Sequence, residues 1–275
     1  MKKNYLLILL ISLLLSIPVY AHSPRVREHQ LEEEISTDDI IAEIKFGRDV
    51  AARIIGKYGI YKDDELTKYL NLLGRSLASG ANRPELNFVV GILDTTTINA
   101  FAAPGGYIFI TKGVIDTVDN EAQLAAVIAH EIIHIAQRHI VKELNIRASE
   151  SSSTSGLSRL LSGTSETTRI AFSKAIDETV TILFERGYKK NDEIEADTMG
   201  VMLASSTGYN PTALVTFIEK IKQLKDQDTS NYKSLYPPFD ERIKHIKDTI
   251  DEEGLAKGEY ITKKERLIAY RKNDE

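Results

Sequence analysis

The stretch that organises this chain is residues 120–140, which read NEAQLAAVIAHEIIHIAQRHI. Its first residue can cap a helix, and the apolar residues that follow recur at helical spacing as far as Ile140. His130 and His134 are four residues apart, so both imidazoles lie on one helix face and can bind one metal ion. The alternative is a hydrogen-bonded pair of core histidines. However, two imidazoles and the carboxylate of Glu131 are costly to bury on an apolar helix without a cation.

A metal site needs a third ligand, and the chain has no cysteine to supply it. The strongest candidate is Glu193, on a predicted helix of residues 192–206. Asp197 shares its helix face and could orient a ligating imidazole, whereas Glu195 points away. A solvated acidic patch at the helix N-terminus is the other interpretation. Two nitrogens, one oxygen and an open position suit zinc best, with iron or manganese as alternatives.

Other parts of the chain predict further helices and a small sheet. Apolar periodicity indicates helices, and β-branched or aromatic runs between turn residues indicate strands. The expected helices are 36–56, 63–78, 211–224 and 240–251, and the expected strands are 86–93 and 107–111. Between the strands, the Pro-Gly-Gly of residues 104–106 predicts a tight reversal. Its small residues would let a ligand backbone come close, although a plain hairpin turn is the alternative.

Composition excludes several classes of protein. The 275 residues are 42% hydrophobic and 27% charged, as in ordinary globular proteins. Lys and Arg total 35 against 40 Asp and Glu, a formal charge of −5, so we expect no nucleic-acid partner. The lack of cysteine excludes disulfides and thiol catalysis.

The N-terminus has the features of a secretory signal peptide over residues 1–21. Lys2 and Lys3 form a basic start, residues 6–15 are almost wholly apolar, and small residues precede a cleavage site after Ala21. An uncleaved anchor is the alternative, but the apolar run is shorter than the ~20 residues that span a bilayer. We therefore expect a periplasmic or otherwise exported protein.

Two segments are predicted to be less ordered than the rest of the chain. Residues 149–168 contain twelve Ser or Thr and predict a mobile loop, which could form a lid with a short helical turn around Leu157, Leu160 and Leu161. Residues 257–275 are strongly charged and predict a solvated terminal helix or tail.

Four motifs together carry a resemblance to a known family. HEIIHIAQRH, GYKKNDEIEAD, GYNP and the earlier NAFAAPGGYIFIT resemble the zinc metallopeptidases of the HtpX and BepA type, soluble relatives of the CAAX prenyl proteases. The likeness covers residues 44–243. It implies one zinc ion per chain and a set of site residues: the ligands His130, His134 and Glu193, the general base Glu131 and the supporting acid Asp197.

The resemblance also implies that residues 107–111 form the edge strand beside the active-site cleft. Because an edge strand has unpaired backbone groups, an extended peptide could add to it and be cut without strict side-chain selection. The residues expected to contact substrate are Asn99, Ala100, Gly106 and Tyr107.

One part of the chain departs from the family pattern. The family usually has His-Pro-Pro before a downstream arginine, and here Tyr236 stands in place of the histidine, followed by Arg242. Arg242 could stabilise the oxyanion, and the Tyr236 phenol could donate to it. The alternatives are an ion pair for Arg242 and a packed turn aromatic for Tyr236. His139 falls on a different helix face from the pair and is interpreted as a structural or supporting residue.

The sequence therefore predicts a mainly helical α+β fold, a zincin-like domain over residues 22–275 with a small sheet whose edge strand borders the cleft. The predicted activity is zinc-dependent endopeptidase cleavage of misfolded or unassembled envelope proteins, for quality control. The expected partners are unfolded or extended polypeptides. A peripheral association with the membrane or with envelope assembly machinery is also compatible with the sequence. The alternative is a chaperone-like or assembly-factor module with a self-blocked, rarely active zinc site.

Overall fold

A computed structural model describes residues 35–144, 156–227 and 238–271, so the predicted signal peptide and Tyr236 lie outside the described residues. Within these ranges no helix combines the length and apolarity needed to cross a bilayer. The helices are α1 (Thr37–Tyr58), α2 (Asp64–Ala78), α3 (Lys112–Thr117), α4 (Glu121–Ala136), α5 (His139–Glu143), α6 (Gly156–Ser162), α7 (Glu166–Thr181), α8 (Lys190–Ser206), α9 (Ala213–Gln227), α10 (Phe239–Glu252) and α11 (Lys264–Arg271). The strands are β1 (Val89–Leu93), β2 (Ala100–Ala103) and β3 (Tyr107–Thr111), and the short turns are η1 (Pro104–Gly106), the π-helical η2 (Ile182–Arg186) and η3 (Leu255–Lys257).

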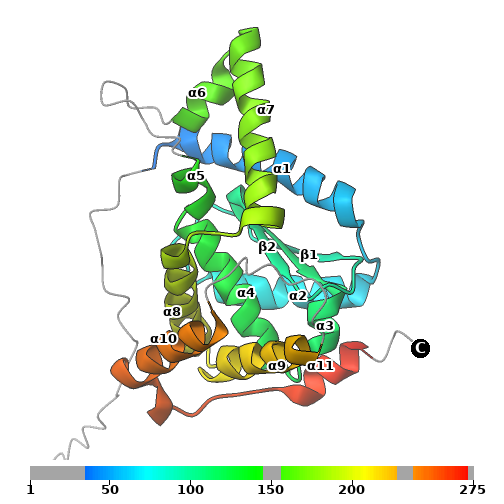
Figure 1. The fold of residues 1–275 in the computed structure, drawn as a ribbon, viewed down its shortest axis with the longest axis vertical. Coiled ribbons are helices and arrows are strands. Elements are labelled where there is room, and N and C mark those ends of the chain that lie inside the picture. Colours follow the sequence, from blue (N-terminus) through cyan, green and yellow to red (C-terminus); the bar gives the residue numbers. More distant parts are fainter. Residues whose placement is uncertain (1–34, 145–155, 228–237, 272–275) are drawn as a thin grey trace, which may run out of the picture.

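The fold is α+β and mainly helical, with one small mixed sheet (Figure 1). The strand order is β1-β3-β2, with β1 parallel and β2 antiparallel to β3. The prediction that residues 107–111 form the edge strand is therefore wrong. The η1 reversal folds β2 back on one side of β3 and β1 pairs on the other side, which leaves β3 in the centre and β2 at the edge.

The glycines of η1 allow two other segments of the chain to pack closely against this turn. Gly105 and Gly106 have φ values of 78° and 101°, which favour glycine. A Cβ on Gly105 would lie 2.6 Å from the Cα of Ile44 in α1, and one on Gly106 would lie 2.6 Å from the carbonyl oxygen of Asn87. The close approach that was predicted for a ligand backbone is thus made by α1 and by the segment before β1.

The sheet separates two clusters of buried side chains, because successive residues of a strand face opposite sides. Ile108 and Ile110 face the larger cluster, which includes residues of α2, α4, α8 and α9. Phe109 faces the smaller cluster, which includes Phe46 of α1 and Ile176 of α7. In Figure 1, α1 and α7 accordingly lie above the sheet and α4 runs below it.

The helix that was predicted to run to Ile140 ends at Ala136, and Ile140 belongs to the separate helix α5. Arg138, between the two, has a left-handed backbone (φ 56°). Its Nε donates over 3.0 Å to the carboxylate of Glu43, which is fully buried on α1. This turn redirects the chain and sends His139 back toward α4 instead of on around the helix.

The Ser/Thr-rich segment and the charged C-terminal segment both contain helices, and the short helical turn predicted around Leu157, Leu160 and Leu161 falls within α6. Residues 156–162 form α6, with Leu157 fully buried, and α7 begins at Glu166, so this part of the expected mobile loop is helical. The charged C-terminal segment includes α11, whose Leu267 is fully buried among core residues. Each short helix has one fully buried leucine that packs in the core, a signal that polar composition conceals.

Candidate metal centre

The site forms where α4 and α8 cross. Asn120 caps α4 by accepting a hydrogen bond from the Gln123 amide, which starts the helix that carries both histidines. Gly200 lets α8 come close, because a Cβ there would lie 3.1 Å from both the Cα and the backbone nitrogen of His130. Glu193 lies in the first turn of α8, so the crossing brings it to the histidine face of α4.

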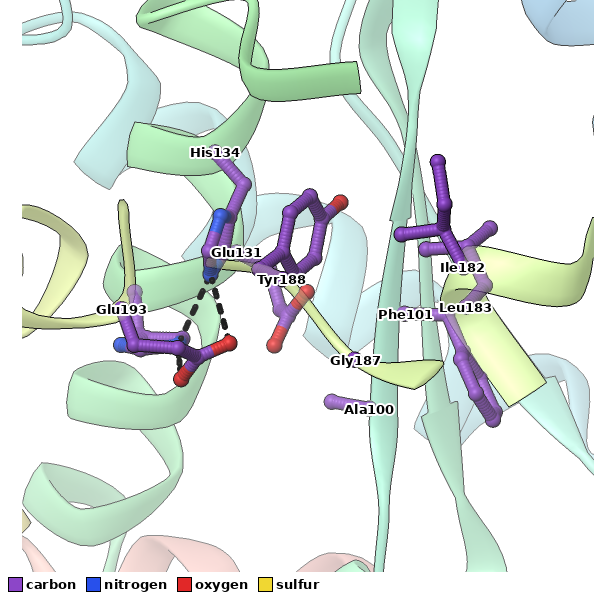
Figure 2. A pocket seen from close by; sticks show the side chains of 10 residues that line it. Ala100, Phe101, Glu131, His134, Ile182, Leu183, Gly187, Tyr188 and Glu193 are labelled. Carbon is purple, nitrogen blue, oxygen red and sulfur yellow. Dashed lines mark hydrogen bonds and ion pairs between the residues drawn. The ribbon is translucent and has the colours of Figure 1, made fainter. Parts of the chain in front are cut away.

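Three donor groups converge at this crossing. The Nε2 atoms of His130 and His134 lie 3.1 Å apart. Glu193 Oε2 lies 3.6 Å from His130 Nε2, and Glu193 Oε1 lies 3.7 Å from His134 Nε2 (Figure 2). One ligand atom from each side chain lies within 4.8 Å of the others, so the three could hold a metal ion.

The state of Glu193 shows that the site suits a cation. Its side chain is completely buried, and neither carboxylate oxygen has a hydrogen-bond partner among the described residues. A buried carboxylate without hydrogen bonds is strongly destabilising unless positive charge lies beside it. Arg242 Nη1 lies 3.9 Å from Glu193 Oε2. Burial alone lowers the pKa of His130, but the carboxylates of Asp197 and Glu193 raise it to about 10. The site therefore attracts positive charge even without a metal.

Asp197 connects His130 to Arg242. Its Oδ1 lies 3.0 Å from His130 Nδ1, the ring nitrogen that faces away from Glu193. Arg242 donates to both carboxylate oxygens of Asp197, over 2.8 Å and 2.7 Å. Burial tends to raise the pKa of Asp197, but Arg242 and His130 together hold it below its usual value. Arg242 therefore has the ion pair that was its alternative interpretation, and Asp197 is positioned to orient His130.

Glu131 and His134 have pKa values set first by burial. Burial raises the pKa of Glu131 to about 7, while it lowers that of His134 well below its usual value, helped by His130 and His139. A neutral His134 has a lone pair for a metal. A cation on the three ligands would lower the pKa of Glu131 again, because opposite charge favours the carboxylate.

A small pocket opens onto these groups and is bordered by the edge strand β2. Figure 2 shows Tyr188 between His134 and the part of β2 that contains Ala100. Its ring stacks on His134 with centroids 3.9 Å apart and planes 15° apart, and its hydroxyl donates over 3.1 Å to the carbonyl of Ala102. Sequence reasoning missed Tyr188, since nothing local links it to His134.

Of the four residues expected to contact substrate, Ala100 lines the pocket, whereas Asn99, Gly106 and Tyr107 are not among the described residues that line it. The Asn99 side chain accepts a hydrogen bond from the amide of Ala100. None of the described residues 156–168 lines the pocket either. The described part of the Ser/Thr-rich segment thus packs as α6 and the start of α7, away from the three ligands.

A second group of polar side chains adjoins the site. His139 Nδ1 lies 2.8 Å from His134 Nδ1, and His139 Nε2 lies 3.3 Å from Glu195 Oε2. The sequence placed His139 on another helix face because it continued α4 through the break at Arg138. The presence of a third histidine in the motif was the one signal that pointed to it.

Comparison with known proteins agrees with this geometry. The profile of peptidase family M48 matches residues 64–250, which include both helices that carry the ligands. The chain belongs to peptidase family M48. Its M48 relatives include the beta-barrel assembly-enhancing protease of Escherichia coli (strain K12), 28% identical over 227 residues that make up 80% of this chain and 46% of that protein.

Two further M48 relatives are similar over most of this chain. Metalloprotease LoiP of Escherichia coli (strain K12) is 26% identical over 197 residues, 70% of this chain and 74% of that protein. Mitochondrial metalloendopeptidase OMA1 of Arabidopsis thaliana is 23% identical over 217 residues, 78% of this chain and 41% of that protein. The chain spans about half the length of the beta-barrel assembly-enhancing proteases it matches. The family is one of peptidases, and both of these relatives are named as metal-dependent peptidases.

Proposed function

We propose that this M48 protein is a zinc-dependent endopeptidase, built as one domain over residues 22–275, that cleaves misfolded or unassembled envelope proteins. The observation that carries the proposal is the convergence of His130, His134 and the fully buried carboxylate of Glu193, whose oxygens have no hydrogen-bond partner among the described residues. Two nitrogens and one oxygen match the ligand set of catalytic zinc sites, which leave one position open. We propose one zinc ion per chain, bound by this set of ligands.

The chemistry is divided between the ion and the chain. A bound zinc ion would polarise the scissile carbonyl and make a water molecule acidic near neutral pH. To Glu131, which lines the pocket, we assign the role of accepting the water's proton and passing it to the leaving amine. Asp197, held by Arg242, keeps His130 oriented. Tyr236, beyond the described residues, remains our candidate donor to the oxyanion.

The substrate would bind as an extended strand along β2. The carbonyl of Ala102 points away from β3 and accepts a hydrogen bond from Tyr188, as an incoming backbone amide also could. Ala100, which lines the pocket, would lie beside the scissile bond. We keep Asn99, Gly106 and Tyr107 only as neighbours that shape this edge. Recognition through the backbone suits unfolded polypeptides, because it needs no particular side chain.

The cellular setting is inferred from the N-terminus and from a relative. The signal-peptide features of residues 1–21 favour export to the periplasm. The first of the relatives above is named for enhancing beta-barrel assembly, which favours a role near the envelope assembly machinery. A peripheral association of this chain with that machinery or with the membrane is part of the proposal.

The decisive test is a purified Glu131→Gln variant. It should keep its zinc, because all three ligands remain, and should cleave an unfolded casein-type substrate about 10²- to 10⁴-fold more slowly, because the proton acceptor is gone. Zinc content by elemental analysis and cleavage by gel or fluorescence assay measure the two effects. Cleavage at the parental rate would refute the mechanism.

A chaperone-like or assembly-factor module with a self-blocked zinc site is the second candidate. The observation that favours it is Tyr188, which covers His134 and occupies the Ala102 carbonyl that a substrate strand would need. In a self-blocked site, Tyr188→Ala should raise casein cleavage, and Tyr188→Phe, which keeps the ring but loses the hydrogen bond, should raise it less. In an efficient peptidase neither variant should be faster than the parent. Cellular function that survives Glu131→Gln would also favour the binding module.

A further inference from the structure

The two histidines of the site each have a ring nitrogen that faces away from Glu193, and each of these nitrogens has a partner. His130 Nδ1 faces Asp197 at 3.0 Å, which the mechanism above already uses. His134 Nδ1 faces His139 Nδ1 at 2.8 Å, and His139 in turn faces Glu195 at 3.3 Å. The second chain of contacts has no part in the function proposed so far.

The positions of the protons follow from these contacts. His134 can bind a metal through Nε2 only if that nitrogen carries no proton, so its Nδ1 must carry one. Two protonated nitrogens cannot share a 2.8 Å contact, so His139 Nδ1 must carry no proton and accept a hydrogen bond from His134 Nδ1–H. His139 then carries its own proton on Nε2 and donates a hydrogen bond to the carboxylate of Glu195. Each residue thereby sets the tautomer of the next.

The environment of His139 keeps this arrangement in place. The side chain is 1% exposed, so water does not compete for its nitrogens, whereas the Glu195 side chain is 43% exposed and reaches it from α8. The left-handed turn at Arg138 directs His139 toward His134, and the buried Glu43 carboxylate holds that turn. Nothing in this arrangement needs His139 to touch a metal or a substrate.

We propose that His139 and Glu195 are positioning residues for the metal site, which fix the tautomer and the ring orientation of His134 through a carboxylate–imidazole–imidazole chain. The inference rests on the proposed function, because it assumes that His134 is a metal ligand. It assigns a role in metal affinity to Glu195. By helix geometry alone, Glu195 points to a different face of α8 from the ligand Glu193. Partners of this kind typically change metal affinity about 10- to 100-fold.

The test measures zinc affinity of the purified chain by competition with a chromophoric chelator. His139→Leu removes the acceptor for His134 and should weaken zinc binding about 10- to 100-fold. His139→Asn places an amide oxygen near the position of Nδ1 and should regain most of the loss, a rescue that general packing would not produce. With cobalt as the probe, the visible spectrum of His139→Leu should differ from that of the parent and of His139→Asn.

Glu195 allows a second test of the same proposal. Because Glu195 is partly exposed, this test does not depend on whether a variant of a buried residue still folds. Glu195→Ala, at a partly exposed side chain, should weaken zinc binding several-fold, toward the lower end of the same range. Its matched control is Glu219→Ala, since Glu219 is 45% exposed and pairs with Lys247 at the same 3.3 Å. The control should leave zinc affinity unchanged, and the metal-free thermal midpoints show whether either variant merely unfolds.

The outcomes distinguish a failure of the proposed function from a failure of the positioning role. A parent protein that binds no zinc would overturn the proposed function itself. Suppose that the parent binds zinc, and that Glu195→Ala and every folded His139 variant bind zinc as tightly as the parent does. The positioning role alone is then refuted. Binding of a second zinc ion that Glu195→Ala abolishes would also refute it, because His139, Asp192 and Glu195 would then be a metal site of their own.

Discussion

Glu193 is the residue at which folding and metal binding are most closely coupled. The fold buries its carboxylate completely and gives neither oxygen a hydrogen-bond partner among the described side chains and backbone. A bound cation removes this penalty, so metal binding should act as a folding contribution. The stability of the protein is therefore expected to depend on zinc.

The first prediction concerns metal removal. Zinc should raise the free energy of unfolding of the parent by about 4 kcal/mol when its free concentration exceeds the dissociation constant 1,000-fold. Glu193→Gln loses the charged ligand and should lose most of this gain. Glu219→Gln should keep it, because Glu219 is 45% exposed and is not one of the candidate ligands. Thermal unfolding with and without a chelator measures both. An equal zinc effect in Glu193→Gln and the parent would contradict the ligand assignment.

The second prediction concerns Glu131 in the metal-free protein. Burial raises its pKa from 4.5 to about 7, so between these values the folded state holds a proton that the unfolded state has lost. Stability contributed by this group must then fall as pH rises from 4.5 to 7, by up to about 3 kcal/mol. Glu131→Gln does not titrate, so its stability relative to the parent should increase across this range.

Urea denaturation of chelator-treated protein at several pH values checks this expectation. The difference between Glu131→Gln and the parent should be smallest near pH 4.5 and constant above pH 7. A difference that does not change with pH would show that Glu131 titrates normally in the folded protein.

At the scale of elements, the crossing of α4 and α8 creates the site. Gly200 allows the contact, because the ideal Cβ position is only 3.1 Å from backbone atoms of His130. A larger side chain must push the helices apart, which separates Glu193 from the two histidines. Helix spacing and metal affinity should therefore change together.

The third prediction is that Gly200→Val lowers the free energy of unfolding by about 1–3 kcal/mol and also weakens zinc binding. Gly56→Ala on α1 is the control, because no atom lies within 4 Å of its Cβ position. That change should stabilise the protein by about 0.5–1 kcal/mol and leave zinc affinity unchanged. Denaturant titration and chelator competition measure the two quantities. A Gly200→Val protein with parental zinc affinity would show that the crossing tolerates a wider spacing.

At the scale of the whole molecule, the C-terminal helix α11 is joined to the start of α4. Glu121, fully buried in the first turn of α4, accepts hydrogen bonds from Tyr69 and Tyr209 and pairs with Arg266 of α11 at 2.8 Å. Burial, followed by the contact with Glu121, raises the pKa of both tyrosines, so they stay protonated and donate. Leu267 of α11 is fully buried beside this cluster. The C-terminal segment thus supports the helix that carries the histidines.

The fourth prediction follows from this docking. Leu267→Ala should lower the free energy of unfolding by about 2–5 kcal/mol, the usual effect of a cavity at a buried leucine. Leu72→Ala on α2 is the control, since Leu72 is 54% exposed and its loss should change stability by less than about 0.5 kcal/mol. Urea denaturation compares the two variants. Equal effects would mean that α11 is not docked in solution.

Local sequence patterns were enough to predict several features of the fold and the site. The four-residue spacing of His130 and His134 places them on one face wherever that helix forms, and residues 107–111 form the predicted strand β3. The strand alternation, the Asn120 cap and the mainly helical α+β class also follow from neighbours in sequence, because they depend on backbone geometry over a few residues.

Packing between distant segments settled the rest. Which strand lies at the edge, which ring stacks on His134 and which carboxylate reaches His139 all depend on contacts between residues far apart in the chain. The turn at Arg138 is an example, since its left-handed backbone is held by Glu43, 95 residues earlier. Such contacts form only when the buried area of the complete fold compensates for the entropy of ordering them, and no short sequence window contains that balance.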